Sequence, residues 1–225
     1  MSDNVLINLT EVSKEFNGAT GTRALNSVTL DVAKDEFIAI MGPSGSGKTT
    51  LLSLMGGLDY PTSGEIIVDE IPVHKLGTTQ LAEYRRNYVG FIFQQFHLIK
   101  HLTVLENVML PLAITDGSSK NKDEVARRAI SKVGLSGKEE KLPGQLSGGQ
   151  QQRVAIARAI VNEPQIILAD EPTGNLDTAT GQQIMDLLSE LNQEGSTVIL
   201  VTHNEKNAAV AKRTIKLVDG QVVNA

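Results

Sequence analysis

The sequence predicts an α/β fold with a mostly parallel central sheet, an antiparallel β subdomain near the N-terminus and an inserted helical subdomain. Short, continuously apolar runs at residues 37–41, 166–170 and 197–202 are typical of parallel strands covered on both faces. Helical stretches begin at Lys48 and run through 178–195, so strands and helices interleave. This interleaving is the pattern that indicates the fold class.

The remaining elements follow in chain order. The segments "VLINLTEVSKEF", "LNSVTLDVA" and "SGEIIVDE" mix polar and apolar residues, so we expect antiparallel strands at one edge of the molecule. Residues 98–160 have mostly helical patterns. Near the C-terminus, Asp219 and Gly220 lie between two apolar runs and predict a hairpin with a tight turn.

Length and composition indicate one domain, spanning 1–225. We expect a core built from about 1–97 and 161–225, with a helical subdomain at about 98–160. The chain has no cysteine, which excludes disulfides and thiolate metal sites and fits a reducing compartment. The net charge of −5 argues against a broad nucleic-acid-binding face. With neither a secretory signal nor a membrane-spanning apolar stretch apparent, we expect a soluble, cytoplasmic protein.

The segment "GPSGSGKTT" begins directly after the apolar run at 37–41 and fits the phosphate-loop pattern G-x-x-x-x-G-K-[ST]. Its glycines let successive backbone N–H groups point at one anion, and the following helix adds its dipole. Lys48 would reach the β- and γ-phosphates, and the Thr49 hydroxyl would bind Mg²⁺. A glycine turn with an incidental lysine is disfavoured by the strand–loop–helix context, so the sequence predicts a P-loop NTPase. The predicted phosphate-binding residues are Gly42, Pro43, Ser44, Gly45, Ser46, Gly47, Lys48, Thr49 and Thr50.

Two acids end the apolar run at 166–170, where parallel sheets bind ligands. Asp170 would hold Mg²⁺ through water, and Glu171, pointing to the other side of the strand, would polarise an attacking water. Adjacent acids at a strand end are about equally often solvated loop residues. The phosphate loop in the same chain favours the catalytic interpretation.

Two further polar residues follow apolar runs. His203 ends the run at 197–202 and should reach the same edge of the sheet, although a histidine here is more often a core or capping residue. Gln94 follows "GFIF" and could bridge Mg²⁺ and water, although alone it would be a turn residue.

The segment "LSGGQQQR" predicts a second helix N-terminus with glycines. Ser147 fits an N-cap, and with Gly148 and Gly149 it would form a second anion cradle. A plain helix cap would explain Ser147 but not the pair of glycines. A second copy of the chain could use this cradle to cover the exposed face of a nucleotide on the first copy.

The phosphate loop, Gln94, "LSGGQ", "ILADE", "NLD" and His203, in this order, resemble the ATP-binding subunit of an ABC transporter. The resemblance implies a head-to-tail homodimer in which ATP and Mg²⁺ bind between the two copies. It assigns Asp170 to Mg²⁺, together with Thr49 and Gln94, and makes Glu171 the base and His203 the γ-phosphate sensor. Residues contributed to the partner's nucleotide or across the interface would be Ser147, Gly148, Gly149, Gln150 and Asp177.

The adenine partner in this family is usually an aromatic residue in the N-terminal strand region. Phe16 is the candidate here, with a core phenylalanine as the alternative. The insertion at 17–22 makes the alignment uncertain at this position.

"DEPTGNLD" and "GFIFQQFHLI" resemble the lipoprotein-release and macrolide-export branch (LolD/MacB-like), which includes the division-associated FtsE type. This implies a peripheral protein at the cytoplasmic face of the membrane that drives a separate integral-membrane permease, contacted through about 96–112. The alternative is an ATPase that regulates a membrane partner without transport. DNA-acting relatives carry either a very long coiled coil, for which the interval between Lys48 and Ser147 leaves no room, or zinc modules, which need cysteine. Ribosome-acting relatives usually carry two tandem cassettes, and this chain has one phosphate loop. A small-molecule kinase would leave "LSGGQ" and Glu171 without a role.

Overall fold

The computed structural model describes residues 4–16, 21–114 and 119–224. Its central sheet has the strand order β10-β9-β3-β8-β7-β6. The pairings among β9, β3, β8, β7 and β6 are all parallel, whereas β10 pairs antiparallel with β9. The mostly parallel sheet predicted from the sequence is therefore confirmed. The bounds are β3 Phe37–Met41, β6 Val89–Ile92, β7 Ile166–Asp170, β8 Thr197–Val201, β9 Arg213–Val218 and β10 Gln221–Asn224.

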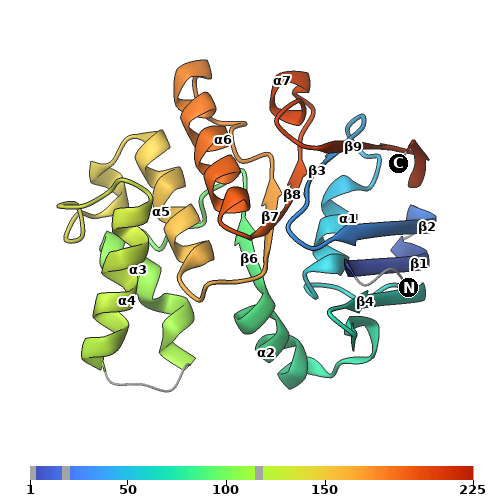
Figure 1. The fold of residues 1–225 in the computed structure, drawn as a ribbon, viewed down its shortest axis with the longest axis horizontal. Coiled ribbons are helices and arrows are strands. Elements are labelled where there is room, and N and C mark those ends of the chain that lie inside the picture. The colour runs from blue at the N-terminus through green and yellow to red at the C-terminus, as the bar shows by residue number, and fades with distance from the viewer. Residues whose placement is uncertain (1–3, 17–20, 115–118, 225) are drawn as a thin grey trace.

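A second, antiparallel sheet has the order β2-β1-β4-β5. It lies beside α1 (Figure 1) and confirms the expected antiparallel subdomain. Its strands are β1 Val5–Phe16, β2 Thr22–Ala33, β4 Ser63–Val68 and β5 Ile71–Pro72.

Helices cover both faces of the central sheet and form a separate cluster beyond it (Figure 1). Their contacts join α3 to α4 and α5, and α5 to α6 and β6. The α-helices are α1 Lys48–Met55, α2 Thr78–Tyr88, α3 Val104–Met109, α4 Ser119–Lys132, α5 Gly148–Ile160, α6 Thr178–Gln193 and α7 Glu205–Ala208. Short 3-10 turns are η1 Val73–Lys75, η2 Leu110–Ile114 and η3 Pro143–Gln145.

Two hydrophobic cores lie on opposite faces of the central sheet. Phe37 and Leu200 pack into the core shared with the helical cluster, whereas Ile38, Ile40 and Val201 pack into the core shared with α1 and the antiparallel sheet. Successive residues of a strand point to opposite faces, so a strand buried on both faces must be apolar throughout. This explains the unbroken apolar runs in the sequence.

Asn107 of α3 holds the segment that follows Gln94. This side chain is fully buried, and its Nδ2 donates to the carbonyls of Ile99, Leu102 and Thr103, while its Oδ1 accepts from the Ile99 N–H. The buried amide therefore satisfies the Ile99 N–H and adds a donor to three carbonyls of the loop before α3. It fixes the entrance to the helical cluster.

The C-terminal hairpin braces the phosphate loop. Asp219 and Gly220 both have positive φ, 47° and 75°, which gives the tight turn expected from the sequence. The Gly220 N–H donates to the carbonyl of Ser46 at 3.1 Å, and the Gly220 carbonyl accepts from the Asn26 N–H at 2.8 Å. This turn therefore links β2 to the loop that begins α1.

We expect Gly220→Ala to destabilise the chain by about 2–3 kcal/mol, because alanine adds strain at positive φ and its Cβ would lie 2.8 Å from the Ala24 carbonyl oxygen. Gly137→Ala is the matched control, since Gly137 has φ of 82° and nothing within 4 Å of an added Cβ. It should cost only about 1 kcal/mol. Urea unfolding measures both. Equal losses would contradict the bracing role of Gly220.

Candidate active site

Three parallel strands end at one edge of the central sheet and deliver the predicted site residues there. Ile40 of β3 and Asp170 of β7 both pair with Val201 of β8, so the residues that follow each strand emerge together. A cleft of about 720 Å³ opens at this edge. It is lined by Thr22, Arg23, Ala24, Gly42, Pro43, Ser44, Gly45, Gly47, Lys48, Thr49, Thr50, Gln94, Asp170, Glu171, Val201 and His203.

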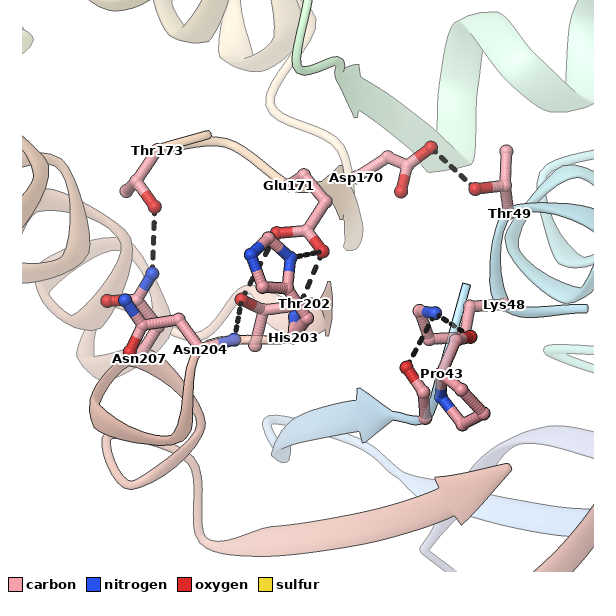
Figure 2. A network of polar contacts seen from close by, with 11 residues as sticks. Pro43, Lys48, Thr49, Asp170, Glu171, Thr173, Thr202, His203, Asn204 and Asn207 are labelled. Atoms are coloured by element: carbon pink, nitrogen blue, oxygen red, sulfur yellow. Dashed lines mark hydrogen bonds and ion pairs between the residues drawn. The ribbon is translucent and has the colours of Figure 1, made fainter. Parts of the chain in front are cut away.

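The phosphate loop has no room for a side chain at Gly42 or Gly47. Gly47 has φ of 100°, and a Cβ there would lie 2.3 Å from the Ala24 carbonyl oxygen. A Cβ on Gly42 would lie 2.0 Å from the Leu217 carbonyl oxygen. The Lys48 ammonium donates to the carbonyls of Gly42 and Pro43, each at 2.8 Å (Figure 2). Two carbonyls of the loop therefore hold the Lys48 ammonium beside the loop backbone.

Thr49 and Asp170 place two oxygen ligands side by side, with the Thr49 hydroxyl donating to Asp170 Oδ2 at 3.0 Å. Burial raises the pKa of Asp170; the Thr49 hydrogen bond opposes this, the nearby Glu171 charge adds to it, and Lys48 opposes it. A hydroxyl and a carboxylate are the hard oxygen donors that Mg²⁺ prefers, so the residues present fit this ion.

Gln94 also lines the cleft. Its backbone carbonyl accepts from Asn175 Nδ2 at 2.9 Å. A Cβ on Gly174 would lie 2.7 Å from Gln94 Nε2, so the glycine makes space for the amide. Gly174 and Asn175, which follow Glu171, therefore pack against Gln94 and position it.

Glu171 points away from Asp170, toward the end of β8 (Figure 2). Its backbone has φ of 46°, and its N–H donates to the Val201 carbonyl at 2.9 Å. Glu171 Oε1 accepts from the His203 N–H at 2.9 Å and lies 2.6 Å from His203 Nδ1. The Glu171 side chain is 15% exposed and that of His203 is 74% exposed. The carboxylate is therefore held in a mostly buried position, and the imidazole contacts it from the solvent side.

The second anion cradle that the sequence predicts lies outside this cleft. Ser147 caps α5, where its Oγ accepts from the Gln150 N–H and Gln150 Oε1 accepts from the Ser147 N–H. A Cβ on Gly149 would lie 2.3 Å from Thr180 Cγ2, so the glycine allows close packing of α5 against α6. Asp177 caps α6 and accepts from Thr180. The structure does not bring Ser147, Gly148, Gly149, Gln150 or Asp177 into the lining of the chain's own phosphate-loop cleft.

Phe16 lies at the end of β1 with a 45% exposed side chain. The alternative interpretation of Phe16 as a core residue is therefore wrong. Phe16 pairs with Thr22, which lines the cleft, and Lys14 Nζ lies 5.0 Å from the ring centroid. Residues 17–20 of the adjoining insertion lie outside the described residues.

Sequence reasoning missed several residues at the site. Arg23 and Ala24 reach the cleft only because β2 passes beside the phosphate loop. Thr202 is completely buried and contacts Glu171. Its signal was present in the sequence, since Thr202 directly follows four apolar residues and precedes His203. Ser46, in contrast, has a buried side chain that does not line the cleft.

Within the parts of the chain that the structure describes, no helix has the length and apolar character needed to span a membrane. Residues 25–174 match the family model described as ABC transporter.

Individual relatives and solved structures cover nearly the whole chain. The ABC transporter ATP-binding protein MJ0796 of Methanocaldococcus jannaschii is 48% identical, covering 96% of this chain and 95% of that protein. The dimeric structure of a post-hydrolysis state of this cassette, bound to ADP and Pi, has a TM-score of 0.90 at 45% identity and covers 97% of both chains. The macrolide export ATP-binding/permease protein MacB of Escherichia coli is 45% identical over 97% of this chain, which spans about a third (34%) of MacB.

We expect Asp170→Asn to stabilise the chain at neutral pH in the absence of nucleotide and Mg²⁺. The raised pKa of Asp170 means that its contribution to stability is present at low pH and is lost as pH rises through the folded-state pKa. The amide carries no charge and still accepts from Thr49. Thermal unfolding should give the variant the higher Tm at about pH 7, with the difference shrinking toward about pH 4. A wild type that is the more stable protein at neutral pH would contradict this account.

Proposed function

The chain belongs to the ABC transporter family, and we propose how its residues hydrolyse ATP and what hydrolysis drives. It is an ATP-binding subunit and an ATPase, whose partners are a second copy of itself and a membrane permease. One observation carries the proposal: the parallel strands place the phosphate loop, Asp170, Glu171 and His203 around one cleft.

The triphosphate binds in the loop at 42–50. Backbone N–H groups of this loop and the start of α1 surround the β-phosphate, and Lys48 exchanges its two carbonyl partners for phosphate oxygens. The loop is already curled by its positive-φ glycines, so binding needs little backbone rearrangement. Phe16, which pairs with the cleft-lining Thr22, stacks on the adenine.

Thr49, Asp170 and Gln94 would hold Mg²⁺. The ion, when bound, neutralises charge on the β- and γ-phosphates. Burial and the nearby Glu171 charge raise the pKa of Asp170, which disfavours the ionised carboxylate. A cation bound beside Asp170 would favour the ionised form.

Glu171 acts as the base. The water oxygen forms a bond to the γ-phosphorus, the bond from that phosphorus to the bridging oxygen of ADP breaks, and its electron pair leaves with ADP. The water proton moves to Glu171 Oε1, and His203 moves from this oxygen to the γ-phosphate. The exposed imidazole has the freedom for that exchange.

The second copy supplies the rest of the site. Ser147, Gly149 and the first N–H groups of α5 lie outside their own cleft, so we propose that they bind the γ-phosphate held by the partner subunit. Asp177, capping α6 beside them, lies across the same interface. The pairing is two-fold, and ATP forms part of the interface.

A groove of about 460 Å³ is the proposed docking site for a cytoplasmic segment of the permease. Its wall includes Phe91 and Phe93, stacked with centroids 5.5 Å apart, and His97 against the Phe93 edge. Arg158 fixes this wall by donating to the carbonyls of Phe96 and His97. The groove meets the expected contact region 96–112 at His97 and Pro111. Through this contact the subunit lies at the cytoplasmic face of the membrane and drives a permease of the macrolide-export or lipoprotein-release type.

Glu171→Gln should bind ATP with near-normal affinity but lose about 10²- to 10⁴-fold in turnover, because the amide cannot accept the water proton. The variant should accumulate as an ATP-bound dimer. Steady-state ATPase assays and size-exclusion chromatography with ATP measure both properties. Unchanged turnover would remove Glu171 from the role of base.

Ser147→Arg should abolish hydrolysis while leaving ATP binding by monomers intact, because the bulky cation blocks only the partner's γ-phosphate. Fluorescent-nucleotide titration at low protein concentration measures monomer binding, with Ser136→Arg, an exposed serine of the same cluster, as control. If monomers of Ser147→Arg bound ATP poorly, the assignment to the partner's site would be wrong.

A further inference from the structure

Thr202 is a polar residue at a buried position, where apolar residues are the usual choice. It follows β8, whose last four residues are all buried apolar side chains, and it is itself fully buried. Burying a hydroxyl costs free energy unless its hydrogen-bonding groups are satisfied. Valine has almost the same shape without this cost, so the hydroxyl needs an explanation.

The hydrogen bonds of Thr202 fix the direction of its single hydrogen. Thr202 Oγ1 accepts from the Asn204 N–H at 3.1 Å, and Asn204 in turn caps α7. The hydroxyl hydrogen is then donated to Glu171 Oε2 at 3.3 Å (Figure 2). This is a long hydrogen bond, of the kind that tightens when a reactive complex forms. The Asn204 N–H fixes the orientation of the Thr202 hydroxyl, so the hydroxyl points at Glu171 before substrate binds.

The two oxygens of Glu171 therefore have different partners. Oε1 is held by His203, through both its N–H and its exposed ring. Oε2 is held by Thr202, which no ligand can displace because it is buried. Movement of the His203 ring exposes one oxygen and leaves the other in place.

We propose that Thr202 is a positioning residue for hydrolysis: its hydroxyl anchors Glu171 Oε2 so that Oε1 faces the attacking water. This inference rests on the proposed role of Glu171 as the base. The hydrogen bond from Thr202 prevents the Glu171 carboxylate from rotating. This matters because a small misplacement of a catalytic group lowers the rate by a large factor.

The test compares Thr202→Val with Thr202→Ser and with Thr197→Val. Thr197 is the matched control, because it is fully buried at the opposite end of β8 and its Oγ1 accepts from the Asp35 N–H at 2.9 Å. We expect Thr202→Val to lower kcat about 10- to 100-fold while KM for Mg-ATP and ATP-induced dimerisation change less than about two-fold. Thr202→Ser should restore kcat to within about two-fold of wild type, and Thr197→Val should leave it unchanged.

Combination with Glu171→Gln separates this inference from the proposed function. Adding Thr202→Val to Glu171→Gln should produce no further loss of turnover, since the anchored group is already gone. A further loss of the same factor would overturn the proposal, as would a Thr202→Val variant as active as Thr197→Val or a Thr202→Ser variant as slow as Thr202→Val. If Glu171→Gln itself turns over normally, the role of Glu171 fails instead.

Discussion

The parallel pairing of β3, β7 and β8 is the constraint on which the site depends. Val201 pairs with both Ile40 and Asp170, so one residue sets the height at which three strands end. The phosphate loop, the two carboxylates and the Thr202–His203 pair all begin within a residue or two of that level. Burial on both faces fixes this register, because a slip of one residue would exchange the side chains of the two cores.

Each charged group of the site has an internal partner that a substrate would replace. Carbonyls of the loop hold Lys48, Thr49 contacts Asp170, and His203 contacts Glu171. These contacts keep the site ordered without nucleotide, which lowers the cost of binding. Two features of the site are unfavourable for stability: burial raises the pKa of Asp170, and Glu171 has a left-handed backbone. Such features gather at functional sites.

Local pattern predicted much of the fold and of the site. The apolar runs predicted the central strands, and the glycine loops predicted both helix starts. The sequence did not predict α2, because only Leu81 and Tyr84 of this polar helix are buried. It also did not place Arg23 or Thr202, whose roles arise from β2 beside the loop and from β8 beside β7. Such pairings are tertiary contacts that no local signal records.

We propose that one chain holds only half of each reaction centre, because Ser147 does not line the cleft at its own phosphate loop. The most direct measurement mixes two inactive variants, Lys48→Ala and Ser147→Arg, and follows ATP hydrolysis. In a mixed dimer, one of the two composite sites receives the intact Lys48 and the intact Ser147, so the mixture should regain turnover that neither variant has alone. If the mixture stays as inactive as its components, although mixed dimers form, each chain holds its own complete site and the shared arrangement is wrong.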